Sequence, residues 1–156
     1  MKRTRGVLGL TLVAAAGVAA GWAAQPSGSM SRPYHDGSVW DVGYIRVKPG
    51  MDEAYMAYLA GPWKAQYEAL KKEGLILSYK VIESEPHGPT DFNLMLMTEY
   101  KDLATMEANE AKEDDLMQRI AGDDQKQMQG YKDRSEIREV LANRLSREIL
   151  LEPKLK

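Results

Sequence analysis

Hydrophobic and polar residues alternate in three stretches in the middle of the chain, and this alternation predicts β-strands. Residues 38–50 read SVWDVGYIRVKPG, in which Val, Trp, Tyr and Ile dominate until a Pro-Gly pair ends the stretch. Residues 75–84 and 91–100 are two further strands, joined by the sequence EPHGPT. Because this connection is short and rich in proline and glycine, we expect an antiparallel hairpin with His87 exposed at its tip.

Apolar residues at intervals of three and four predict a helix after the first strand. It covers residues 51–70, with Asp52 as its expected N-cap, and the chain leaves it at Gly74. Its apolar face consists of Tyr55, Leu59, Trp63, Tyr67 and Leu70. Proline lacks a backbone donor and clashes with the preceding turn, so we expect a kink or a new start at Pro62.

Three more elements follow the hairpin. We predict a helix over residues 102–122 capped by Asp102, a further helix over residues 123–144, and a short last strand over residues 146–153. The inner positions expected for the second of these helices are Met128, Tyr131, Ile137, Val140 and Leu141.

The order of these elements defines a fold. Strand, helix, strand, strand, helix, strand, with an extra helix before the last strand, is the split βαβ arrangement of ferredoxin-like proteins. The sequence therefore predicts one α+β domain over residues 38–156. It contains a four-stranded antiparallel sheet with helices on one face.

The two faces of the predicted sheet differ in polarity. One face, which includes Leu94 and Leu96, is apolar and belongs under the helices. The opposite, open face includes Ile76, Ile82, Met95 and Met97. It is more apolar than a solvated sheet face, and such a surface marks an interface or a ligand surface. We therefore expect a homodimer that pairs through the open face.

The element order and the apolar open face resemble the dimeric α/β-barrel proteins. That group includes small antibiotic-biosynthesis monooxygenases, stress-responsive barrel proteins and NIPSNAP-like proteins. The resemblance covers Trp40 to Glu152 and rests on WDVGYIRVKPGMDEAYMAYL as strand, turn and helix, and on SREILL as the closing strand. It implies that two sheets face each other and that the cavity between sheet and helices holds a small apolar or amphipathic molecule.

Four polar residues are candidates for orienting such a ligand. Lys80, Asn93 and Glu99 lie on the same side of the predicted sheet, and Asp41 joins them if the register of the first strand allows it. Trp63, next to the expected kink, is a candidate cavity wall. The alternative for the polar residues is a Lys–Glu pair across the dimer seam, or charges at the sheet margin that reach water.

The N-terminal residues have the three-part layout of a secretory signal peptide. A basic start, MKRTRG, precedes the apolar stretch VLGLTLVAAAGVAAGWAA, and a polar segment follows. We expect cleavage after Ala23, which gives a signal peptide over residues 1–23, a linker over residues 24–37 and an exported protein, periplasmic or secreted. An uncleaved anchor is the alternative, since residues 7–24 reach about the minimum length of a membrane span. After cleavage no membrane span is expected.

Charge and composition narrow the function further. The chain of 156 residues has a formal net charge of −2, and loss of Lys2, Arg3 and Arg5 with the signal peptide changes it to −5. A mildly acidic protein is a poor candidate for nucleic-acid binding, which needs a basic face. Cysteine is absent, so the chain offers neither disulfides nor a thiolate nucleophile.

No motif in the sequence identifies a reaction, and the catalytic residues stay unassigned. The acidic run over residues 107–115 lacks an Asp-x-Asp-x-Asp-Gly loop, and two loop histidines do not make a zinc site unaided. We therefore expect no metal and no cofactor. The first hypothesis is an exported small-molecule-binding protein. The alternatives are a cofactor-free monooxygenase or isomerase, with Glu99 as a base, and an envelope protein-interaction module.

Overall fold

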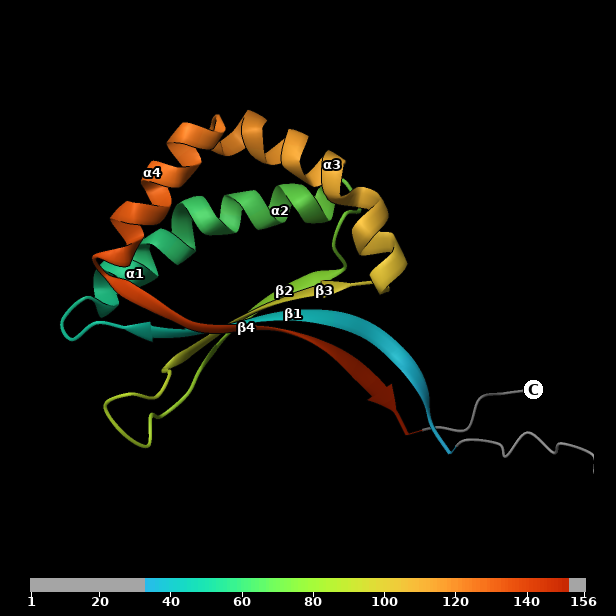
Figure 1. Ribbon diagram of the computed structural model, residues 1–156, viewed down its shortest axis with the longest axis horizontal. Coiled ribbons are helices and arrows are strands. Elements are labelled where there is room, and N and C mark those ends of the chain that lie inside the picture. Colours follow the sequence, from blue (N-terminus) through green and yellow to red (C-terminus); the bar gives the residue numbers. More distant parts are fainter. Residues whose placement is uncertain (1–32, 152–156) are drawn as a thin grey trace, which may run out of the picture. The chain divides into compact units, whose positions relative to one another are not determined.

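The computed structural model describes residues 33–151, whose helices and strands are shown in Figure 1. The predicted signal peptide over residues 1–23 lies outside the described residues. In chain order the elements are β1 (His35–Val47), α1 (Asp52–Tyr58), the π-helical turn η1 (Leu59–Trp63), α2 (Lys64–Lys72), β2 (Ser78–Glu83), β3 (Leu94–Tyr100), α3 (Leu103–Ala121), α4 (Asp124–Ser135) and β4 (Arg138–Leu150). Since β1 begins at His35, the last residues of the predicted linker belong to the first strand.

The four strands within residues 33–151 form one sheet in the order β2-β3-β1-β4, and every neighbouring pair is antiparallel. This is the strand order of the ferredoxin-like fold. The helices lie together on one face of the sheet, as Figure 1 shows. The predicted α+β ferredoxin-like fold, with an extra helix before the last strand, is confirmed. No helix in this described part is long and apolar enough to span a membrane.

The first helical segment keeps one buried face through its π-helical turn. Tyr55, Leu59 and Trp63 are buried at intervals of four, whereas an α-helix turns about 100° per residue and would rotate each of them about 40° past the one before. The Lys64 N–H donates to the Leu59 carbonyl, and this i→i+5 bond makes a wider turn that takes up the drift. Pro62 lies inside this turn, so the helix continues past it. The expected kink is thus a π-helical turn.

The helix ends follow local capping rules with one exception. Asp102 accepts a hydrogen bond from the Thr105 N–H at 2.7 Å, as expected for the N-cap of α3. Gly74 has a φ of 71° just after α2, a conformation that favours glycine. The expected N-cap Asp52 is instead the first helical residue of α1, and Met51 takes the cap position. The negative charge of the Asp52 carboxylate then stabilises the positive end of the helix dipole.

The helix predicted over residues 123–144 is confirmed only in its first half, and its second half is a strand. Helix α4 ends at Ser135, and β4 begins at Arg138, well before the predicted last strand, to pair with β1. The β1–β4 register shifts between Tyr44 and Ile45, which leaves one extra residue in β4. This bulge breaks the two-residue alternation that would have revealed a strand in the sequence.

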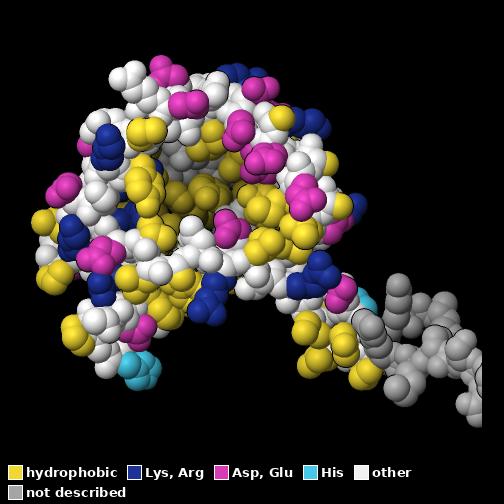
Figure 2. All heavy atoms as spheres, viewed as in Figure 1, with side chains coloured by type: hydrophobic (Ala, Val, Ile, Leu, Met, Phe, Trp, Pro, Cys, Tyr) yellow, Lys and Arg dark blue, Asp and Glu magenta, His cyan; other side chains and the backbone are white. Residues whose placement is uncertain are grey.

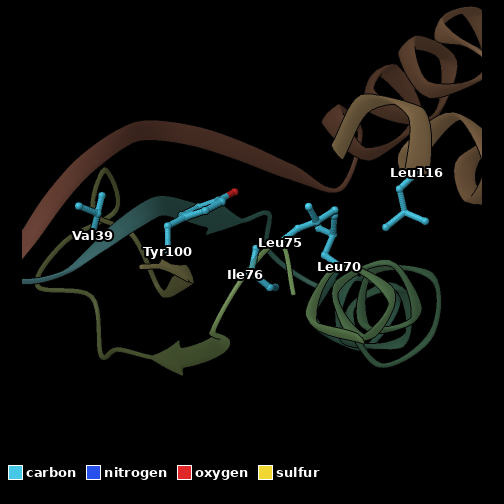
Figure 3. Close-up of a cluster of buried hydrophobic side chains, with 6 residues drawn as sticks. All are labelled: Val39, Leu70, Leu75, Ile76, Tyr100 and Leu116. Atoms are coloured by element: carbon cyan, nitrogen blue, oxygen red, sulfur yellow. The ribbon is translucent and has the colours of Figure 1, made fainter. Parts of the chain in front are cut away.

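Two clusters of buried side chains pack between the sheet and the helices. One consists of Val39, Leu70, Leu75, Ile76, Tyr100 and Leu116, and the other of Ile45, Val47, Tyr55, Leu59, Trp63 and Leu94. Figure 3 shows Leu116 of α3 near Leu70 of α2 in the first cluster. Ile76 was expected on the open face, but it precedes β2 and is buried in this cluster. Tyr67 and Tyr79 pack against both clusters.

Candidate functional site

A cavity of about 400 Å³ lies between the helix-facing side of the sheet and the helices. Residues of β1, β3 and β4 form its floor, and residues of the helical segments form its walls. Figure 2 shows it as a hollow with hydrophobic side chains deep inside and charged side chains around the rim. Its volume is in the range of pockets that bind small organic molecules.

Aromatic side chains form one wall of the cavity. Trp63 and Tyr67 stack with their ring centroids 4.1 Å apart, and Tyr79 supports Trp63 edge-on at 5.2 Å. Tyr55 and Tyr58, one turn earlier, stack 5.9 Å apart. The π-helical turn aligns Tyr55 and Trp63 on the same side, so that this wall is continuous. Trp63 therefore lines the cavity, in the position that its place in the sequence suggested.

Two carboxyl groups belong to an acidic part of the cavity. Asp41 of β1 is the register partner of Thr98 in β3 and faces the helices, while Glu113 of α3 accepts a hydrogen bond from the Tyr100 hydroxyl at 3.4 Å. Burial raises the pKa of both carboxyls, because it removes water from the charged form. Burial also raises the pKa of Tyr100, and the charges of Glu113 and Asp41 add to that shift. The two carboxyl groups thus lie close enough for both of their charges to raise the pKa of Tyr100.

Two arginines form a basic part of the same cavity. The guanidinium carbon of Arg134, at the end of α4, lies 4.9 Å from the centre of the Tyr58 ring. That of Arg138, at the start of β4, lies 5.6 Å from the ring centres of both Tyr55 and Tyr131. Such cation–π contacts hold the guanidinium groups in place while leaving their edges available for hydrogen bonds.

Three donors in the basic part have no hydrogen-bond partner within residues 33–151. They are Nε of Arg134, Nε of Arg138 and the hydroxyl of Tyr55, and all three are shielded from solvent. Burial raises the pKa of Tyr55 to about 12, although both arginines oppose the shift, so its hydroxyl is a neutral donor at physiological pH. Buried donors in proteins are nearly always paired, so three unpaired ones in residues that line one cavity are unusual.

The structure does not bring the four predicted polar residues together. Lys80 and Glu99 lie on the open face: Lys80 Nζ is 4.7 Å from the centre of the Trp40 ring, and Glu99 accepts a hydrogen bond from the Ser78 hydroxyl. Asp41 follows Trp40 in β1 and therefore points to the opposite side, into the cavity. The register of β1 therefore does not allow Asp41 to join Lys80 and Glu99.

Asn93 has a separate place at the end of the β1–β3 pairing. Its Oδ1 accepts a hydrogen bond from the Val47 N–H at 2.9 Å, and its own N–H donates to the Ile45 carbonyl at 3.0 Å. These bonds extend the strand pairing beyond β3. Asn93 also lines a smaller hollow of about 360 Å³ near α1, which does not share a residue with the acidic or basic part of the cavity.

Sequence reasoning missed the basic part of the site. Arg134 and Arg138 fell within the helix predicted over residues 123–144, where both would count as solvated surface charges. Only the break between α4 and β4 places Arg138 on a strand that faces the cavity. Glu113 was grouped with the acidic helix surface, and nothing in its neighbourhood in the sequence distinguishes it from the other acidic residues.

A second hollow, of about 480 Å³, adjoins the cavity. The two share Tyr58, Gln66, Met117 and Arg134, and the second extends past Pro62 towards α4. Arg134 therefore stands where the two spaces meet. Among residues 33–151 there is no group of three or more His, Asp or Glu side chains arranged to hold a metal ion.

The open face of the sheet carries a largely apolar surface. Val42 is only 5% exposed on this face, and Tyr44, Met95 and Met97 are half-buried, whereas Ile82 is 38% exposed. No helix of the described part of the chain covers this face (Figure 1). This face therefore exposes apolar side chains that no helix covers within residues 33–151.

The comparisons with known proteins gave similar structures but no family. No family model matches the sequence, and no curated protein matches it. HapK from Hahella chejuensis is similar in structure, with a TM-score of 0.48 and 12% identity over 70% of this chain and 91% of HapK. A dimeric ferredoxin-like protein from an uncultured marine organism is also similar, with a TM-score of 0.47 and 15% identity over 74% of this chain and 96% of that protein. Both likenesses concern the fold alone.

Proposed function

We propose that this protein binds a small organic molecule in the cavity between its sheet and its helices. One observation carries the proposal: a hollow of about 400 Å³ has an aromatic wall and is lined by two arginines that form no salt bridge within residues 33–151. A mostly apolar pocket with a few convergent polar groups is the usual form of a small-molecule site. A bound molecule would fill the space and pair with the arginine side chains that line it.

Native mass spectrometry of the purified protein tests this proposal. Val140 lines the cavity and Leu145 lies on the same strand outside it, 52% exposed, so Val140→Trp fills the cavity and Leu145→Trp is the matched control. We expect a retained small molecule on the wild type and on Leu145→Trp, and none on Val140→Trp. Absence of retained ligand, together with no binding of any aromatic fragment added to the wild type, would contradict the proposal.

We also propose that the protein is a homodimer paired through the open face. Val42 is buried there without a covering helix in the described residues, and Met95 and Met97 extend the apolar surface beside it. Water-exposed apolar surfaces of this kind favour association, and a second copy presents the same surface in return. In this arrangement the cavity lies on the far side of each sheet from the dimer seam.

The proposed location is outside the cytoplasm, after cleavage at Ala23. The support is the basic, apolar and small-residue pattern at the start of the sequence. N-terminal sequencing of the protein from its host should give Ala24 as the first residue. An intact Met1 in the membrane fraction would instead indicate the uncleaved anchor.

A cofactor-free monooxygenase or isomerase is the second candidate function, and Asp41 favours it. Burial raises the pKa of this carboxyl inside the cavity, which suits a group that accepts and returns a proton. Glu99, the base considered from the sequence, lies on the open face. If the retained ligand is a substrate, the wild type converts it and Asp41→Asn binds it without conversion. Equal conversion by both proteins would exclude Asp41 as the base.

A further inference from the structure

The charges around the cavity are separated in a way that bears on the kind of ligand it accepts. The charges of Arg138 and Arg134 lower the pKa of the Tyr55 hydroxyl, whereas the charges of Glu113 and Asp41 raise the pKa of the Tyr100 hydroxyl. Neither arginine forms a salt bridge with a carboxylate of residues 33–151. The cavity therefore offers two cations at one part of its wall that its own carboxyls do not neutralise.

The arginines are held by aromatic rings and not by acids. Arg134 rests on Tyr58, and Arg138 lies between Tyr55 and Tyr131. Ring contacts fix the plane of a guanidinium but use none of its N–H groups. Both arginines line the cavity, so two guanidinium groups that no carboxylate neutralises belong to one region of its wall.

An anionic group would satisfy this region. Carboxylates and related oxyanions accept several hydrogen bonds at once, and hydrogen bonds from a guanidinium to such groups are among the strongest in proteins. A neutral ligand would leave two partly buried cations without an ionic partner, which is unfavourable. The aromatic wall of Trp63 and Tyr67, stacked at 4.1 Å, suits a flat apolar body next to the anion.

We infer that the ligand is an organic monoanion, whose charged group lies on the guanidinium groups of Arg134 and Arg138 and whose flat apolar body lies against Trp63 and Tyr67. This inference rests on the proposed binding function and specifies its ligand class. Asp41 and Glu113 on the acidic part limit the ligand to a single anionic group, because a second anion placed there would meet like charge.

Three naphthalene probes of similar shape test the inference by calorimetry on the wild-type protein. 2-Naphthoate carries one anion, 2-naphthamide is its neutral counterpart, and 2,6-naphthalenedicarboxylate has an anion at both ends. We expect 2-naphthoate to bind at least about tenfold more tightly than either of the others, as a charge-assisted hydrogen bond is worth about that factor. Equal binding of 2-naphthoate and 2-naphthamide overturns the inference but leaves the binding function standing. No binding of any probe contradicts both.

Substitutions locate the anion. Arg134→Gln and Arg138→Gln should each weaken 2-naphthoate binding by about tenfold and change 2-naphthamide binding by less than about threefold. Arg144→Gln is the matched control, since Arg144 rests on the Tyr44 ring at 5.9 Å on the open face, and it should change neither. Arg138→Lys, which keeps the charge without the planar fork, should fall between wild type and Arg138→Gln. Unchanged 2-naphthoate binding by the folded Gln variants would overturn the assignment.

Discussion

Tyr55 combines a fully buried ring with a hydroxyl that has no partner among the described residues. Its ring belongs to the core, so Tyr55→Ala should lower the free energy of unfolding by about 3–5 kcal/mol. Tyr55→Phe keeps the ring and removes only the unpaired donor, so the ligand-free protein should be equally stable or more stable by up to about 1 kcal/mol. Urea denaturation measures both. A loss of more than about 1 kcal/mol in Tyr55→Phe would mean that the hydroxyl is paired.

Asp41 gives the protein a stability that depends on pH. Burial is the main cause that raises its pKa above the ordinary 3.8, and the Val42 backbone N–H opposes it. The folded protein therefore binds this proton more tightly than the unfolded chain. The stability that this tighter proton binding adds is fully present below the pKa of Asp41 in the unfolded chain. It is lost as pH rises through the pKa of Asp41 in the folded protein. Asp41→Asn does not titrate, so its stability relative to wild type should increase from pH 3.5 to pH 7 in urea denaturation.

Asp91 provides a control of opposite sign. The backbone N–H groups of His87 and Phe92 donate to its carboxylate and lower its pKa. Its contribution to stability is present above the unfolded pKa and is lost as pH falls through the folded pKa. Asp91→Asn should therefore lose stability relative to wild type as pH rises over the same range. If both variants change in the same direction, the assignment of Asp41 is wrong.

We predict that the side chain of His87 is dispensable for stability. Its side chain is 98% exposed in the loop between β2 and β3, where its Nδ1 lies 3.8 Å from Oδ2 of Asp91 and its backbone N–H donates to the same oxygen. His87→Ala keeps that backbone bond, so the melting temperature should change by less than about 3 °C. A larger drop in a thermal melt would mean that the imidazole has a structural role.

At the scale of elements, periodicity predicted the regular parts of the fold and failed where one residue is added. The intervals of Tyr55, Leu59 and Trp63 correctly indicated one buried face, but no simple pattern tells a proline kink from a π-helical turn. The bulge opposite Tyr44 and Ile45 in β4 hid a strand for the same reason. An inserted residue costs little in a structure and destroys the regular repeat on which sequence reading depends.

The candidate site was only partly predictable for a related reason. Of the residues proposed from the sequence, Asp41 and Trp63 line the cavity, and both lie in strongly patterned segments. Lys80 and Glu99 were correctly placed on one face, but that face is not the one with the cavity. The arginines come from the junction between α4 and β4, where the element boundary itself was misplaced. Element boundaries decide which side chains face a cavity, and they are the least certain part of a sequence pattern.

Helix α4 should depend strongly on its N-cap. None of its twelve residues is fully buried, and Asp123 accepts a hydrogen bond from the Lys126 N–H at 2.9 Å. Asp123→Ala should destabilise α4 by about 1 kcal/mol, seen as faster amide hydrogen exchange in α4 than in wild type. Asp123→Asn retains an acceptor and serves as the control. Unchanged exchange in Asp123→Ala would show that packing, not capping, holds the helix.

For the whole molecule, the open face decides the oligomeric state. Light scattering should give a wild-type mass of two chains at micromolar concentration. Met97→Lys places an ammonium group in the proposed seam, and its desolvation should leave a monomer or an aggregating protein. Met128→Lys is the matched control, because Met128 is 59% exposed on α4, and it should remain a dimer.

The alternative outcomes of that measurement are distinct. A stable wild-type monomer would contradict pairing through the open face and favour the envelope protein-interaction hypothesis for this surface. A dimer that Met97→Lys leaves intact would place the seam elsewhere, for example along the exposed side chains of β4, such as Leu145 and Ile149. Neither outcome affects the cavity, which a single chain forms on the opposite side of the sheet.

The pairing of the first and last strands has a practical consequence. His35 and Leu150 are register partners, so the two ends of the ferredoxin-like domain lie side by side, as Figure 1 shows. A short linker could join them, and new termini could open in the loop over residues 85–90. Such a circular permutant would keep every strand pairing of the sheet. A reporter protein could be fused to the new termini in this loop. The protein would then serve as a sensor for a molecule bound in the cavity.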